Sequence, residues 1–218
     1  MNTEKRDAAQ KALEQGRHED LRALLTEEPA LAQSRAEQGL SLVMLASYRQ
    51  DPVALEILLA AEPDLDVHEA AAVGDLERLC VLLEEDSSRA TVPAADGFQP
   101  LHLAAYFGAE QVARELVSRG APTDEPVATP AKLRPLHSAV AGGHLGIVEL
   151  LLAARVTVDA RQAGDFTPLM AAAVGGWSEI LERLLTAGAD PSLEAEGKTA
   201  ADLAREHGHA DLATRLDG

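Results

Sequence analysis

A six-residue pattern returns four times along this chain, and its even spacing constrains the fold more than any other feature. Each copy can begin a helix, because a Thr-like first residue caps the first turn and Pro at the first helical position lacks an amide that would have no partner. Evenly spaced helix starts are typical of a stack of similar units. The copies, 32 to 35 residues apart, are Gln99–Ala104 (QPLHLA), Arg134–Ala139 (RPLHSA), Thr167–Ala172 (TPLMAA) and the degraded Thr199–Ala204 (TAADLA).

Each copy ends in alanine, and aligning the chain on this alanine extends the pattern to seven units. A glycine follows four residues later in six units, where it is expected to end a first helix in a left-handed cap; the second unit has Gln50 instead. An apolar pair 12 and 13 residues after the alanine indicates a second helix, and only the seventh unit breaks it, with Asp217. The seven alanines are Ala12, Ala46, Ala70, Ala104, Ala139, Ala172 and Ala204.

With these motifs the chain resembles bacterial ankyrin-repeat proteins over nearly its whole length. The resemblance implies an all-α solenoid of about seven ankyrin-type helix–loop–helix repeats with β-hairpin fingers, and it implies protein binding on the concave face. We expect one continuous solenoid over residues 1–218. The expected units are approximately 5–28, 41–62, 64–86, 98–120, 133–155, 166–188 and 198–218.

Two spacings depart from the rule. The step from Ala46 to Ala70 is 24 residues, about ten short, so we expect a shortened finger between units two and three. The order Asp66-x-x-Glu69 predicts a capping box at the start of the next helix. The step from Ala104 to Ala139 is 35 residues and includes three prolines within 122–132, which predict a longer irregular loop.

Composition excludes several classes of protein. A single cysteine leaves no disulfide framework. No apolar run reaches 18 residues and the start has no apolar signal region, so we expect a cytoplasmic protein without a membrane span. The net charge of −17 argues against nucleic-acid binding. Residues 41–98 carry 12 acidic and only 3 basic residues, which serve either solubility or attraction of a basic flank on a partner.

Residue types that catalyse reactions or bind metals and phosphates in other proteins have structural interpretations in this chain. His102 and His137 stand in the repeated pattern and are expected to bond the adjoining turn. His207 and His209 flank a helix-ending glycine without a third ligand nearby, Cys80 lies on an apolar helix face, and the glycine pairs 142–143 and 175–176 fall at helix ends. We therefore predict no catalytic, cofactor-binding or metal site.

The expected binding surface lies at the two positions before each helix-ending glycine. These hold Tyr48-Arg49 in unit two and Tyr106-Phe107 in unit four, so two stacking steps put the tyrosines roughly 20 Å apart. Phe98 and Phe166 lie on fingers and are expected to overhang this groove, although Phe107 and Phe166 would equally suit packing between units. Trp177 either packs on the neighbouring turn or is an exposed anchor.

The most consistent function is a protein–protein interaction scaffold, a monomer that binds a partner protein on the concave groove and fingers. Partner contacts are predicted at Tyr48, Arg49, Phe98, Tyr106, Phe107, Phe166 and Trp177. The alternative is a regulatory or inhibitory subunit of a larger complex, which differs in stoichiometry. An enzyme with a site assembled from loops is disfavoured, because no catalytic motif stands in its required context.

Overall fold

The computed structural model describes residues 3–36 and 39–217, which form fourteen α-helices in seven consecutive antiparallel pairs and no sheet. The predicted all-α repeat solenoid is confirmed; the last residue of the seventh expected unit, 218, lies outside the described residues. The pairs are α1 (Thr3–Glu14) with α2 (His18–Glu27), α3 (Leu42–Tyr48) with α4 (Pro52–Leu59), α5 (Val67–Val73) with α6 (Leu76–Glu85), α7 (Pro100–Phe107) with α8 (Glu110–Ser118), α9 (Pro135–Ala141) with α10 (Leu145–Ala153), α11 (Pro168–Gly175) with α12 (Ser178–Thr186), and α13 (Ala200–Glu206) with α14 (Ala210–Leu216). Three short 3-10 turns, η1 (Pro29–Gln33), η2 (Ser87–Ala90) and η3 (Ala163–Asp165), lie between pairs.

The repeated pattern sets where the first helices begin and end. Pro at the first position opens α7, α9 and α11, and the Thr167 hydroxyl accepts a hydrogen bond from the Met170 amide at 3.3 Å. Gly108 ends α7 with a φ of 80°, a left-handed conformation that glycine adopts without a steric cost. Gln50 takes the same role in unit two with a φ of 51°, so the turn geometry persists without the glycine.

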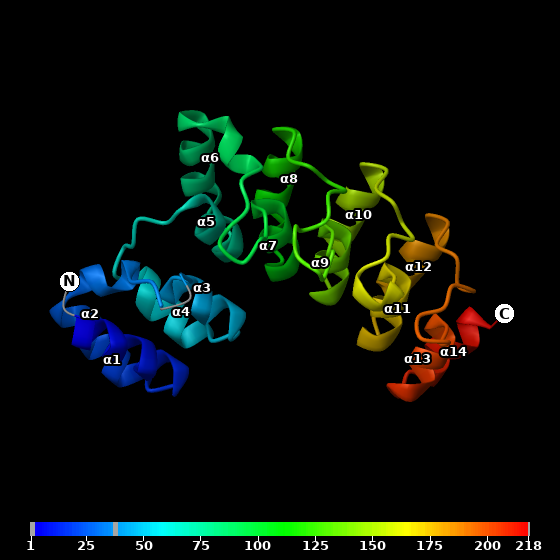
Figure 1. Cartoon of the computed structure of the whole chain (residues 1–218), viewed down its shortest axis with the longest axis horizontal. Helices are drawn as coiled ribbons and strands as arrows, with labels where there is room; N and C mark the ends of the chain where they lie inside the picture. The colour runs from blue at the N-terminus through cyan, green and yellow to red at the C-terminus, as the bar shows by residue number, and fades with distance from the viewer. Residues whose placement is uncertain (1–2, 37–38, 218) are drawn as a thin grey trace.

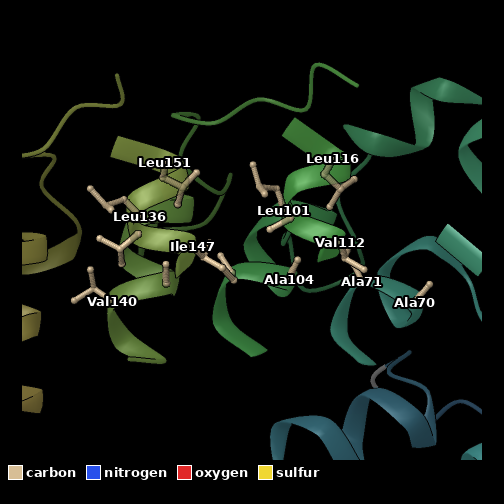
Figure 2. Close-up of a cluster of buried hydrophobic side chains, with 14 of the residues drawn as sticks. Ala70, Ala71, Leu101, Ala104, Val112, Leu116, Leu136, Val140, Ile147 and Leu151 are labelled. Atoms are coloured by element: carbon tan, nitrogen blue, oxygen red, sulfur yellow. The ribbon is translucent and has the colours of Figure 1, made fainter. Parts of the chain in front are cut away.

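The core runs through the stack between the helices of successive pairs. It is built from Leu, Ala, Val and Ile, and Figure 2 shows these side chains filling the space between units three, four and five. Leu101 and Leu136 are fully buried, while Ala104 and Ala139 are small enough to let neighbouring helices approach closely. The core therefore needs few aromatic residues.

The stack is curved. In Figure 1, α6, α8, α10 and α12 lie along the outer edge of an arc, and α7, α9 and α11 lie on its inner side. The helices of the first two pairs lie across the direction of the later helices, at one end of the arc. The inner side therefore carries the first helix of each later pair.

The fingers are turns rather than strands. The turn before α7 is closed by the Ala94 amide, which donates to the Phe98 carbonyl at 2.8 Å. In the described residues only isolated bridges occur, at Arg35 with Ser41 and at Ala195 with Lys198, so the expected β-hairpins are reduced to their tips. The loop 122–132 is irregular, as its prolines predict.

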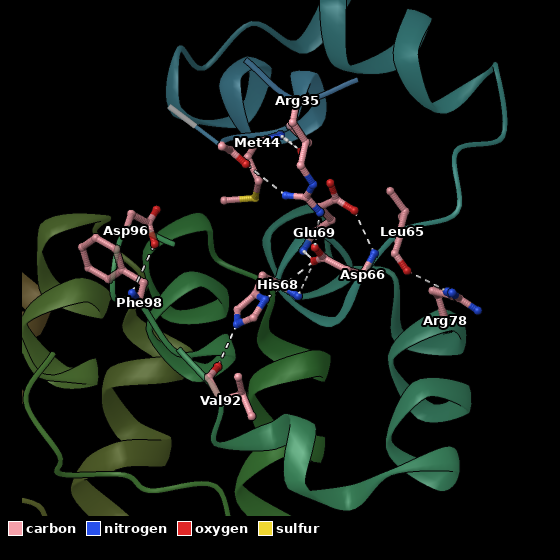
Figure 3. A network of polar contacts seen from close by, with 12 residues as sticks. Arg35, Met44, Leu65, Asp66, His68, Glu69, Arg78, Val92, Asp96 and Phe98 are labelled. Atoms are coloured by element: carbon pink, nitrogen blue, oxygen red, sulfur yellow. Dashed lines mark hydrogen bonds and ion pairs between the residues drawn. The ribbon is translucent and has the colours of Figure 1, made fainter. Parts of the chain in front are cut away.

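The connection between α4 and α5 is as short as the spacing predicts. Asp66 and Glu69 form the predicted capping box at the start of α5, and Arg35, from the preceding finger, pairs with Asp66 at 2.8 Å (Figure 3). The two neighbouring fingers meet there, since a methyl group on Gly39 would lie 3.8 Å from the Ala95 Cβ. A hollow of about 220 Å³ opens between these fingers and the start of α5, with Arg35, Asp66 and Asp96 in its wall. Because the connection between α4 and α5 is short, unit two lies directly against the finger that precedes unit four.

Candidate protein-binding surface

Three aromatic rings form a continuous ridge, which we call the aromatic ridge: Tyr48, Phe107 and Tyr106. The centroid of the Phe107 ring lies 5.4 Å from that of Tyr48 and 5.1 Å from that of Tyr106. Both tyrosines therefore contact one phenylalanine, and the expected separation of roughly 20 Å between them, two helix spacings, is wrong. Tyr106 is the most accessible of the three, with 37% of its surface exposed.

Tyr48 reaches unit four because unit three offers no obstacle. The corresponding position of unit three is Ala72, which is buried beneath the contact together with Met44 and Leu103. Tyr48 also donates its hydroxyl hydrogen bond to Asp96 Oδ2 at 2.7 Å. Burial and the hydrogen bond to this carboxylate raise the pKa of Tyr48, so the phenol stays protonated. The ridge is consequently fixed at its unit-two end.

Phe98 extends the apolar surface onto the finger. Its ring meets that of His102 edge-on, with centroids 6.2 Å apart. Phe98, Phe107 and Tyr48 pack on the small buried cluster of Met44, Ala72 and Leu103, which is separate from the main core. Sequence reasoning placed Phe98 beside the groove, and the structure brings it together with the ridge.

Two hollows open on either side of Tyr106. The larger, about 480 Å³, extends toward the turns between helices and includes Leu55, Val73 and His144 in its wall. The smaller, about 170 Å³, lies toward the fingers between α7 and α9. It is lined by Tyr48, Phe98, His102, Leu103, Tyr106, Leu133, His137, Ser138 and Ala141. A chain crossing Tyr106 would thus find a recess on each side.

The histidines of the repeated pattern are structural, as predicted. The Nε2 of His102 bonds the Leu133 carbonyl at 3.2 Å, and that of His137 bonds the Ala160 carbonyl at 3.0 Å. Burial lowers the pKa of each to about 4, so both rings are neutral at physiological pH. They join each inner helix to the next finger and add no positive charge to the smaller hollow.

Three other predicted contact residues lie apart from the ridge. Arg49 donates through Nη2 to the Glu14 carbonyl at 2.7 Å, where it caps the end of α1. Phe166 packs against the main core, in keeping with the alternative of packing between units, and it lines neither hollow. Trp177 lies on the neighbouring turn, where a methyl group on Gly143 would lie 2.8 Å from its ring, and 40% of its surface is still exposed.

The residues after the helix-ending glycines link successive units. His144 bonds the Tyr106 carbonyl at 2.9 Å and His209 bonds the Val174 carbonyl at 3.2 Å, each lying over a glycine of the preceding unit. The glycine pairs thus make room for these rings. Within residues 3–36 and 39–217, no cluster of His, Cys, Asp or Glu has the form of a metal site, and none of their helices is long and apolar enough to cross a membrane.

Asp96 is a residue of this surface that sequence reasoning missed. It precedes Gly97 in the finger, and its Oδ1 accepts from the Phe98 amide at 3.2 Å, a local turn typical of an Asp-Gly pair. That turn could be predicted from sequence. Its second oxygen, which holds Tyr48 from another unit, depends on the shortened connection and could not.

Comparison with known families agrees with this architecture. A family model of three ankyrin repeats matches residues 67–163, and a model of a single ankyrin repeat matches residues 164–195. The chain therefore belongs to the ankyrin-repeat family. Members of this family generally bind other proteins, and nothing in the matches indicates an enzyme.

Similar curated proteins are much longer than this chain. A human protein, neurogenic locus notch homolog protein 4, is 43% identical over 95 residues, which are 43% of this chain and 5% of that protein. An ankyrin repeat and KH domain-containing protein of Caenorhabditis briggsae is 31% identical over 188 residues, which are 81% of this chain and 7% of that protein. These relatives are animal proteins and give no support to the bacterial origin that the sequence suggested.

Proposed function

We propose that this chain is a protein-binding module that holds a partner protein on the inner side of the arc, across the aromatic ridge. The observation that carries the proposal is the concentration of aromatic residues. The chain has only six Phe, Tyr and Trp residues, and four of them, Tyr48, Phe98, Tyr106 and Phe107, form one surface between two hollows. Aromatic side chains beside desolvated pockets are typical anchors of protein interfaces.

Charge supports a partner with a basic flank. The 12 acidic and 3 basic residues of segment 41–98 lie on the same units that provide Tyr48 and Asp96. Such an excess attracts basic surfaces over a distance of about 8 Å at physiological salt. We therefore propose electrostatic steering toward the ridge, which predicts that the association rate falls when salt is added.

Stoichiometry separates this scaffold from a regulatory or inhibitory subunit. A scaffold that acts alone is a monomer and binds its partner reversibly, whereas a subunit remains in a complex of fixed composition. Size-exclusion chromatography with light scattering on complexes from the source cells distinguishes them. We propose a monomer, because the helices at both ends of the stack are polar. Lys5, Arg205 and Glu206 on the end units form surface ion pairs within the chain.

The experiment for the proposal is affinity capture with single-residue variants. The purified chain and its Tyr106→Ala variant are incubated with extract of the source cells, and captured proteins are quantified by mass spectrometry. We expect Tyr106→Ala to weaken capture of the specific partner by roughly tenfold or more, the effect of removing an interface anchor.

The matched control is Val81→Ala, which also shortens an exposed apolar side chain but lies on the outer helix α6. We expect this variant to capture the partner as well as the unmodified chain does. Capture that survives Tyr106→Ala and fails with Val81→Ala would place the partner on the outer side and refute the proposal.

A further inference from the structure

The smaller hollow has the size and lining of a pocket for one apolar side chain. Its volume is about 170 Å³, and Phe98, Leu103 and Leu133 give it apolar walls. A cavity of about 150 Å³ with such walls holds benzene, so a leucine or phenylalanine side chain fits. The histidines in the wall are neutral and their Nε2 atoms bond finger carbonyls, while the buried Nδ1 of His102 has no partner in the described residues.

Ser138 adds a polar group to this pocket. It occupies the variable position of the repeated pattern, where unit four has Leu103, and only 4% of its surface is exposed. Its hydroxyl has no hydrogen-bond partner within the described part of the chain. This oxygen is not among the described side-chain atoms that are shut off from solvent without a partner, so water can reach it in the free chain. A hydroxyl both donates and accepts, and an occupant that covers it has to replace the water, because an unpaired covered hydroxyl costs free energy. The backbone of an extended segment that lies over the pocket would supply the missing partner.

Asp96 brings an uncompensated charge to the rim. Its carboxylate accepts hydrogen bonds from the Tyr48 hydroxyl and the Phe98 amide, and both donors are neutral. No ion pair involves Asp96 in the described residues, whereas Asp124 on the next finger is paired with Arg134. The carboxylate is held beside two residues that line the pocket, so a Lys or Arg of the bound segment would be its natural partner.

From these three observations we propose that the pocket binds an extended segment of a partner protein with one leucine- or phenylalanine-sized side chain inside and a basic residue close by in sequence that pairs with Asp96. The proposal rests on the proposed function and specifies the segment that this surface recognises. An acidic segment is disfavoured by Asp96, and a purely polar one leaves the pocket empty.

The test uses short random peptides displayed on phage and selected on the full chain. Selected peptides are then synthesised with a fluorescent label, and their affinities are measured by polarisation. The key variant is Ala141→Leu, which fills the pocket from its exposed rim at the last residue of α9. The matched control is Ala153→Leu, the same change at the exposed last residue of α10.

We expect the selected peptides to share an aliphatic or aromatic residue near Lys or Arg. Ala141→Leu should weaken their binding by roughly 30-fold, Asp96→Asn by several-fold, and Ala153→Leu should not change it. Acidic consensus peptides, no selected peptide, or binding that Ala141→Leu leaves intact would overturn the proposal.

Two further outcomes identify what has failed. If sedimentation shows a dimer that Ala141→Leu dissociates, the occupant is a second copy of this chain and the partner segment is excluded. If partner capture still depends on Tyr106 while no peptide binds the pocket, the pocket proposal alone fails. If capture is also independent of Tyr106, the proposed function fails with it.

Discussion

At the scale of single residues, the same position serves unlike purposes in different units. The slot before the helix-ending glycine holds Tyr106-Phe107 on the ridge, yet in unit two its second residue, Arg49, caps a neighbouring helix. The slot after the glycine holds His144 or Trp177, and both lie over the preceding unit. A position in the repeat therefore fixes the direction of a side chain, while its contacts depend on the unit next to it.

The buried histidines make stability depend on pH in a defined window. The pKa of His102 and of His137 is about 4 in the folded chain and about 6.5 when unfolded, so below pH 6.5 the unfolded chain binds protons that the folded chain does not. The shifted pKa of each histidine contributes up to about 3 kcal/mol to the free energy of unfolding. This contribution is fully present above pH 6.5 and is lost as the pH falls toward 4. Urea denaturation between pH 7 and pH 4.5 measures it.

A matched variant isolates this effect. Burial raises the pKa of Asp66, but hydrogen bonds to its carboxylate outweigh this effect and lower the pKa below the ordinary value of 3.8. The stability that Asp66 gives the folded chain is therefore lost only in more acidic solution. His102→Gln should therefore reduce the fall in unfolding free energy between pH 6.5 and 4.5, and leave the loss of stability in more acidic solution unchanged. An unfolding free energy that stays constant between pH 7 and 4.5 in the unmodified chain would contradict the assignment.

At the scale of helices and turns, sequence predicted much and missed what depends on neighbours. Helix starts at Pro100, Pro135 and Pro168 follow from local chemistry, and so does the Asp66–Glu69 capping box. The contact of Tyr48 with Phe107 does not, because it joins residues 59 positions apart through a gap that only the packed units define. The outcome for Trp177 likewise required the position of Gly143 in the preceding unit.

The turn of unit six provides a test of such packing. A methyl group on Gly175, the last residue of α11, would lie 2.3 Å from Nε1 of the rigid Trp177 ring. We expect Gly175→Ala to destabilise the chain by about 1–3 kcal/mol, as overpacking does. In a Trp177→Ala background the same change should be neutral or stabilising, because alanine favours the helix by about 1 kcal/mol over glycine.

Urea denaturation of the four proteins of this cycle gives the coupling energy. Equal effects of Gly175→Ala in the two backgrounds would show that the indole ring moves away at no cost, and that it does not hold the turn.

At the scale of the whole molecule, the joint between units two and three is the distinctive feature. Elsewhere fingers separate the units at even steps, whereas here the Arg35–Asp66 ion pair and the Tyr48–Asp96 hydrogen bond connect the first two pairs to the rest. In a repeat protein each unit is stabilised by its neighbours. These polar contacts add to the apolar packing of the shared core and of the Met44, Ala72 and Leu103 cluster in holding α1 to α4 to the later units.

Asp66→Ala tests this polar contribution, since it removes both the helix cap and the ion pair. We expect a loss of about 1–2 kcal/mol and faster amide hydrogen exchange in α1 to α4, with α9 to α12 unchanged. The control is Asp75→Ala, which removes the cap of α6, where Asp75 accepts from the Arg78 amide at 2.9 Å, and contacts no earlier unit. Exchange that rises equally in all units would show that the joint is not a separate point of opening.

The ring contact that passes over Ala72 also limits how this surface can be altered. Recombination of ankyrin proteins normally exchanges whole repeats, since each interlocks only with its immediate neighbours. Here units two and four share a contact while unit three contributes a small residue beneath it. Duplicating unit three or restoring its finger would separate Tyr48 from Phe107, and deleting unit three would remove Ala72 from beneath their contact. The surface is therefore inherited, and must be transplanted into another scaffold, as one indivisible block from residue 41 to residue 120.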